Sequence, residues 1–185
     1  GFRFDLMGVL DIETLNEARK ALLKINPDII MYGEGWTGGE STLPESERGM
    51  KINAPRTPGI GMFSDDIRDA VKGHVFYMDE LGFVNGAADR GEELKQAVTC
   101  AKWAKSPMQS INYLSCHDNY TLWDRFIISN SHESEETRIR MNKLAAAILF
   151  TAQGIPFFLH GEEFARTKIS EADGAPVENS YCSPL

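Results

Sequence analysis

Four carboxylate-bearing segments of this chain stand just after short apolar runs. Asp5 ends FRFD, Glu34 follows IIMYG, Asp118 follows the run 109–114, and Glu162 follows IPFFLHG. Short, continuous apolar runs are typical of parallel strands that are buried on both faces. Because ligands of α/β folds bind beyond the carboxyl ends of such strands, we expect these carboxylates to share one edge of a sheet.

Asp5 and Glu34 are the pair whose placement suits glycoside hydrolysis. Neighbouring strands lie about 4.8 Å apart, and retaining glycosidases keep their two carboxyl groups about 5–5.5 Å apart. Arg3 alternates with the phenylalanines of the first run and shares a face with Asp5. An adjacent guanidinium favours an ionised carboxylate, as a nucleophile requires. A purely structural Arg3–Asp5 ion pair is the alternative.

The two other carboxylate motifs also have two interpretations. Glu34 lies between glycines and precedes Trp36, which suits a general acid beside a sugar or an aromatic partner, or else a turn carboxylate that faces solvent. His117 and Asp118 follow a strand, and Asp118 is also a type of residue that caps helices.

No motif indicates a metal or a nucleotide. His117 and Asp118 are neighbours, and neighbouring strand residues point to opposite faces, which disfavours a joint metal site. Cys100, Cys116 and Cys182 lack zinc-ligand spacing, so each is interpreted as a buried, inert thiol. The sequence also lacks a P-loop and a GxSxG motif. We therefore expect no metal ligands and no required cofactor; no cluster suggests Ca²⁺.

The elements that would position these residues alternate between strands and helices. Strands are predicted at residues 2–6, 28–33, 60–63, 109–114 and 155–159, and helices at 12–26, 92–104 and 134–152. A further helix is predicted to begin after a cap at Ser64 or Asp65 and to end at Gly73. The helix faces place Ile25, Ile139 and Leu144 toward a core. Such alternation predicts an α/β fold with a parallel sheet and crossover helices.

Composition excludes several classes of protein. The 185 residues include 19 basic and 27 acidic side chains, a net charge of −8, and 42% hydrophobic residues. This is too apolar for a disordered chain, and no run is long enough to span a bilayer. The acidic balance disfavours a nucleic-acid partner. No signal pattern is visible, so the localisation, cytoplasmic or secreted, is unknown.

Several sequence blocks together resemble the α-amylase superfamily of glycoside hydrolases, and within it the type I pullulanases. The blocks are GFRFDLMG (1–8), MYGEGW (31–36), INAPRTPGIGMFSDDIRDAVKG (52–73), GFVNG (82–86), NYLSCHDNYTLWD (112–124) and QGIPFFLHGEEFARTK (153–168). The resemblance covers nearly the whole chain, and its blocks occur in the family's order.

This resemblance implies specific roles for individual residues. Asp5 would be the nucleophile, Glu34 the general acid and then base, and Asp118 a third carboxylate that binds sugar hydroxyls. Arg3 would keep Asp5 ionised, and His117 would bind the same sugar. The other implied substrate-binding residues are Trp36, as a stacking platform, and Asn179 and Tyr181, in a donor-side loop. His160, the run 171–178 and Leu185 depart from the family pattern, which weakens the inference for that loop.

The resemblance also implies a domain organisation. The chain would supply strands four to eight of a (β/α)8 TIM barrel, a fold that needs about 250 residues. We therefore expect residues 1–185 to be a partial catalytic barrel domain, with the upstream barrel half and accessory domains outside the chain. The rest of the barrel would be its partner in a full-length polypeptide, and the 185 residues alone would be inactive.

The implied function is hydrolysis of α-1,6-glucosidic linkages in pullulan, amylopectin or limit dextrins, with retention of configuration. The expected partner is an α-glucan polysaccharide or oligosaccharide. An isoamylase or branching type of α-glucan enzyme is one alternative. A non-catalytic α-glucan-binding fragment is the other.

Overall fold

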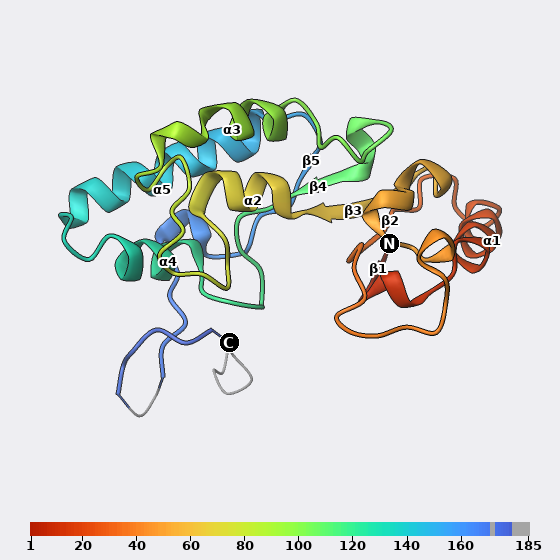
Figure 1. The fold of residues 1–185 in the computed structure, drawn as a ribbon, viewed down its shortest axis with the longest axis horizontal. Helices are drawn as coiled ribbons and strands as arrows, with labels where there is room; N and C mark the ends of the chain where they lie inside the picture. The colour runs from red at the N-terminus through yellow and green to blue at the C-terminus, as the bar shows by residue number, and fades with distance from the viewer. Residues whose placement is uncertain (171–172, 179–185) are drawn as a thin grey trace. The chain divides into compact units, whose positions relative to one another are not determined.

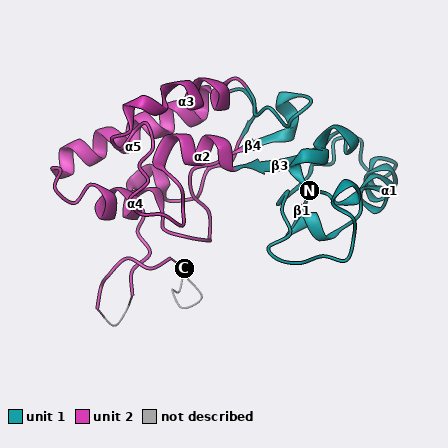
Figure 2. Ribbon diagram, in the orientation of Figure 1, with its two compact units in different colours: residues 1–64, 100–111, 153–155 teal, residues 65–99, 112–152, 156–185 magenta. Residues whose placement is uncertain are grey.

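A computed structural model describes residues 1–170 and 173–178 (Figure 1). The chain forms two compact units (Figure 2). Unit 1 comprises residues 1–64, 100–111 and 153–155, and unit 2 comprises residues 65–99, 112–152 and 156–185. Each unit has a hydrophobic core of its own.

Unit 1 contains the parallel strand pairs. Strands β1 (Phe2–Phe4), β2 (Met31–Gly33) and β3 (Ile60–Ser64) pair in parallel, and the register places Phe4 opposite Gly33 and Gly33 opposite Met62. Helix α1 (Ile12–Leu23) connects β1 to β2. Asp11 caps this helix, because its Oδ1 accepts a hydrogen bond of 2.7 Å from the amide of Thr14. The predicted strand–helix–strand opening is confirmed.

Among the described residues, five strands form one sheet in the order β1-β2-β3-β4-β5, which is also their order along the chain. Strands β4 (Ser110–Asn112) and β5 (Ile155–Pro156) begin in unit 1 and end in unit 2. Short 3-10 helices lie at Met7–Val9, Glu45–Glu47, Lys51–Arg56, Ala88–Arg90, Pro107–Gln109 and Glu162–Phe164.

The core of unit 1 joins the sheet to α1 and to the chain before β3. Its buried members are Met7, Leu15, Met31, Ala54, Ile60 and Met62. The buried amide of Gln109 donates hydrogen bonds to the carbonyl oxygens of Ala54 at 2.8 Å and Thr57 at 3.1 Å. These bonds fix the entry to β3, since buried backbone carbonyls require donors.

Unit 2 is built from four helices in its described part. They are α2 (Asp65–Lys72), α3 (Gly91–Val98), α4 (Leu122–Ser129) and α5 (Glu135–Thr151). Their shared core contains Ile67, Ala70, Val71, Val84, Ala97, Leu114, Leu122, Phe126, Ala145 and Leu149. Thr121 caps α4 through the amide of Asp124 at 3.1 Å.

Several predicted boundaries and core positions are wrong. Helix α3 ends at Val98 rather than at residue 104, and Cys100 adopts a φ of 104°, which cannot continue a helix. Ile25 is 82% exposed because it lies beyond the end of α1. Ile139 and Leu144 are exposed, because burial on α5 follows the stripe that contains Ala145 and Leu149.

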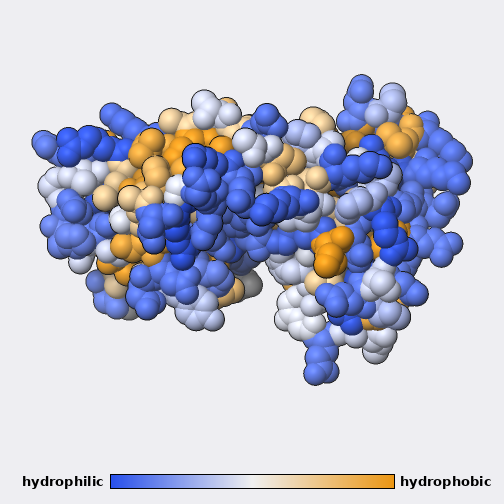
Figure 3. All heavy atoms as spheres, turned by 45° about the horizontal axis from the view of Figure 1, so that its top comes forward, coloured by the Kyte–Doolittle hydropathy of each residue, from blue (hydrophilic) through white to orange (hydrophobic). Residues whose placement is uncertain are grey.

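The visible face in Figure 3 is mostly hydrophilic, with hydrophobic side chains in separate patches. Exposed apolar side chains include Phe2 and Ile30 in unit 1, and Leu144, Phe150 and Phe164 in unit 2. None of the helices in the described residues combines the length and the apolarity needed to cross a membrane.

Replacing Gly73 should destabilise unit 2. Its φ is 86°, and a Cβ would lie 1.8 Å from the carbonyl oxygen of Glu80. We expect Gly73→Ala to lower the free energy of unfolding by about 3 kcal/mol, through left-handed strain and overpacking. Gly39→Ala is the matched control, since a Cβ at this position would have no neighbouring atom within 4 Å. Urea unfolding of both variants measures the difference, and equal midpoints would contradict it.

Candidate active site

Two carboxylates of unit 1 follow adjacent strands. Asp5 comes directly after β1, and Glu34 directly after β2. The amide of Glu34 donates a 3.0 Å hydrogen bond to the carbonyl oxygen of Phe4, so the ladder continues to this point. A Cβ on Gly33 would lie 2.5 Å from the same oxygen, so the close approach of the strands requires glycine there.

Glu34 is buried and held by two donors. It is 6% exposed, and its Oε1 accepts a 2.7 Å hydrogen bond from Nη2 of Arg3. Its Oε2 accepts a 2.8 Å bond from the amide of Leu6. Leu6 has a φ of 41°, a left-handed conformation at the turn after β1. The interpretation of Glu34 as a solvent-facing turn residue is therefore wrong.

Asp5 contacts the same arginine but remains open to solvent. Its Oδ1 lies 3.5 Å from Nη1 of Arg3, and its side chain is 73% exposed. The guanidinium of Arg3 also lies 5.8 Å from the ring centroid of Phe63. Arg3 thus bridges both carboxylates, and its shorter contact is with Glu34 rather than with Asp5.

Trp36 is partly buried in unit 1. The carbonyl oxygen of Trp36 accepts a 3.1 Å hydrogen bond from the amide of Gly8. A Cβ on Gly8 would lie 2.6 Å from that oxygen, so only glycine allows this contact. The ammonium of Lys51 lies 5.4 Å from the centre of the indole ring, and this contact orients the ring.

His117 and Asp118 lie in unit 2, on an irregular segment after β4. Nε2 of His117 is 3.4 Å from Oδ2 of Asp118, and both side chains are substantially exposed. Asn119 has a φ of 59°. Because Thr121 caps α4, the alternative in which Asp118 caps that helix is wrong.

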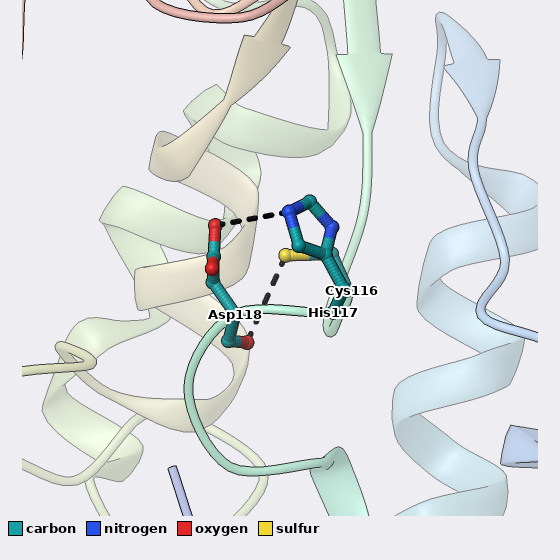
Figure 4. A group of neighbouring side chains, drawn as sticks. All are labelled: Cys116, His117 and Asp118. Atoms are coloured by element: carbon teal, nitrogen blue, oxygen red, sulfur yellow. Dashed lines mark hydrogen bonds and ion pairs between the residues drawn. The ribbon is translucent and has the colours of Figure 1, made fainter. Parts of the chain in front are cut away.

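Cys116, His117 and Asp118 point toward one another (Figure 4), and their potential ligand atoms lie within 4.8 Å. The expectation that neighbouring side chains diverge does not hold, because β4 ends at Asn112 and the chain bends here. Burial raises the pKa of the Cys116 thiol, and a protonated thiol is a poor metal ligand. The interpretation from the sequence, that no metal binds here, stays a prediction.

Unit 2 also contains buried charged side chains that were not predicted as catalytic or binding residues. Glu162 and Lys72 are both buried, and Oγ of Ser115 donates a hydrogen bond to Oε2 of Glu162. Burial raises the pKa of the Glu162 carboxyl and lowers the pKa of Lys72 to about 7. Lys72 ends a helix and therefore resembles a surface residue in the sequence, so no pattern signals its burial.

An exposed aromatic loop was also missed by the sequence patterns. Phe76 and Tyr77 are exposed, and the ring of His74 lies 4.8 Å from that of Tyr77. Nη2 of the buried Arg125 donates hydrogen bonds to the carbonyl oxygens of Tyr77 at 3.1 Å and Glu80 at 2.7 Å. A buried arginine thus holds the loop that presents these rings.

Two predicted binding residues, Asn179 and Tyr181, lie outside the described residues. Their assignment to a donor-side loop stays a prediction.

No family model matches the chain, but comparison with known proteins finds several pullulanases. A pullulanase of Bacillus subtilis (strain 168) is 40% identical over 190 aligned positions, which cover 99% of this chain and 26% of that protein. Pullulanase 1 of Arabidopsis thaliana, a chloroplastic protein, is 32% identical and is covered to 24%.

Solved structures agree with these relatives. The pullulanase of Anoxybacillus sp. LM18-11, complexed with maltotetraose, superimposes with a TM-score of 0.91 at 47% identity, over 98% of this chain and 26% of that one. The chain spans about a quarter of the length of the curated relatives that it matches. Over nearly all of its residues, this chain is therefore similar to one part of the pullulanases.

Proposed function

We propose that residues 1–185 are part of the catalytic domain of a retaining glycoside hydrolase that cleaves α-1,6-glucosidic linkages in pullulan, amylopectin or limit dextrins. The observation that carries this proposal is the Arg3-bridged pair of Asp5 and Glu34, beyond the carboxyl ends of adjoining parallel strands. Similarity to pullulanases over nearly the whole chain favours this substrate class over other glycans.

The five strands would be strands four to eight of a (β/α)8 barrel. Their parallel pairing and sequential order support this assignment. Phe2, in the edge strand β1, is exposed, and so is Ile30, which precedes β2. A closed barrel has no edge strand, so the remaining barrel strands would cover such residues in a full-length polypeptide.

The mechanism would proceed in two steps. The exposed carboxylate of Asp5 attacks the anomeric carbon, while Glu34 gives a proton to the departing O6 of the next glucose unit. Glu34 then takes a proton from water, whose oxygen attacks the same carbon and releases Asp5. Arg3 contacts both carboxylates and so holds them in a fixed position relative to each other.

The remaining residues would bind the glucan. Asp118 and His117, exposed and adjacent, offer an acceptor and a donor for sugar hydroxyls. Trp36 supplies an aromatic face, as do Phe76 and Tyr77. The roles of Asn179 and Tyr181 rest on the family resemblance.

Product analysis tests the proposed reaction. The native polypeptide that carries residues 1–185 should release maltotriose from pullulan, with the α-configuration in the first product observed by NMR. An isoamylase or branching type of enzyme would act on amylopectin but yield little maltotriose from pullulan. A binding fragment would retain α-glucans without releasing any reducing sugar.

Asp5→Asn tests the nucleophile. We expect kcat on pullulan to fall at least about 10⁴-fold, because no glycosyl-enzyme bond can form. Maltotriose binding, measured by calorimetry, should persist, since the substitution is nearly isosteric. Glu17→Gln, an exposed substitution on α1, is the matched control. A kcat within tenfold of the parent would remove Asp5 from the mechanism.

Glu34→Gln separates the acid role from the nucleophile's role. Hydrolysis of pullulan should fall about 10²- to 10⁴-fold, the usual contribution of general acid–base catalysis. With α-maltotriosyl fluoride, whose leaving group needs no proton, the rate of glycosyl-enzyme formation should return towards that of the parent. Rapid-quench kinetics would detect the accumulating glycosyl-enzyme. Equal losses on both substrates would argue that Glu34 has another role.

A further inference from the structure

Lys168 is a buried cation to which no role has been assigned so far. It is 4% exposed and lies in unit 2. Its ammonium donates 2.8 Å hydrogen bonds to two carbonyl oxygens, those of His117 and Glu178. These acceptors are far apart in the sequence, so one side chain ties together two separate segments.

The first segment presents a candidate catalytic carboxylate. The carbonyl of His117 belongs to the peptide bond that joins His117 to Asp118. Fixing this carbonyl therefore restricts the backbone that carries the Asp118 carboxylate. The segment also contains Asn119 in a left-handed conformation.

The second segment comprises residues 173–178, which contact Lys168 and its neighbour Ile169. Ile169 and Pro176 form an antiparallel bridge, and the amide of Val177 donates a 2.8 Å bond to the carbonyl oxygen of Lys168. The ammonium of Lys168 then reaches the carbonyl of Glu178. Glu178 directly precedes Asn179, the first residue of the predicted donor-side loop.

A hydrogen bond also holds the backbone of Lys168 in place. Its amide donates a 2.8 Å hydrogen bond to Oδ2 of Asp124, a buried residue in the first turn of α4. Burial lowers the pKa of Lys168, and the nearby charges of Asp118 and Asp124 oppose this effect. A buried ammonium is costly unless it is well bonded, so its two carbonyl partners indicate a defined role.

We propose that Lys168 is a positioning residue: its ammonium sets the geometry of Asp118 and of the loop entrance at Glu178 together. This inference rests on the proposed hydrolase function. Lys168 touches no substrate in this scheme and acts through the two carbonyl groups.

Lys168→Met tests the inference, because methionine fills similar space without donors. In the native polypeptide that carries residues 1–185, kcat on pullulan should fall about 10- to 100-fold, as expected for a catalytic group displaced by about 1 Å. KM should change less. Hydrogen exchange measured by mass spectrometry should accelerate in peptides covering 113–121 and 173–178, but not in α4. A residue that matters only for stability would lower the melting temperature and leave kcat at 25 °C unchanged.

The matched control is Lys95→Met. Lys95 also lies in unit 2, but its side chain is exposed and pairs with Glu92 at 2.6 Å. Its removal should alter neither kcat nor exchange in either segment. If Lys168→Met does not fold, Lys168→Arg decides the question. Arginine keeps the charge but cannot place one compact donor on both carbonyls, so a reduced kcat with cooperative unfolding is expected.

The outcomes separate the two proposals. Parental kcat in a folded Lys168 variant, with unchanged exchange, overturns the positioning role and leaves the hydrolase function standing. A parent protein that hydrolyses no α-glucan overturns the hydrolase function. Even then, hydrogen exchange in the Lys168 variant shows whether Lys168 fixes the two segments. Unchanged exchange in peptides 113–121 and 173–178 would overturn the positioning role of Lys168 as well.

Discussion

The parallel register that places Phe4 opposite Gly33 is the constraint on which the candidate site depends. It brings the residues after both strands to one edge, so Asp5 and Glu34 come within reach of a single guanidinium. A side chain at position 33 would collide with the Phe4 carbonyl. The close spacing of β1 and β2 therefore accounts both for the burial of Glu34 and for the contact of Arg3 with both carboxylates.

Unit 2 also contains several buried charged side chains. Lys72, Glu162 and Lys168 are removed from water, and each requires polar partners, because an isolated buried charge is costly. Such groups contribute little net stability, but they specify one arrangement of the segments that they join. That specificity matters where a loop must present His117 and Asp118 in a fixed geometry.

Local patterns predict every α-helix of the described residues except α4. Helices α1 and α5 run for twelve and seventeen residues and carry caps at Asp11 and Ser134. Helix α4 is no shorter than α2 and α3, but its buried Asp124 and Arg125 interrupt the apolar pattern. The predicted end of α3 is misplaced because the apolar pattern continues beyond Val98, whereas the left-handed backbone at Cys100 does not allow a helix.

The sequence by itself determined the order of the carboxylates, their position after apolar strands and the resemblance to one enzyme family, because these depend on residue types and spacing along the chain. Only the tertiary structure decided that Glu34 takes the closer contact with Arg3, and that Lys168 is buried between His117 and Glu178. Both depend on groups that folding brings together over long sequence separations. The sequence around a lysine or arginine does not indicate which carbonyl or carboxylate group its side chain will contact in the folded protein.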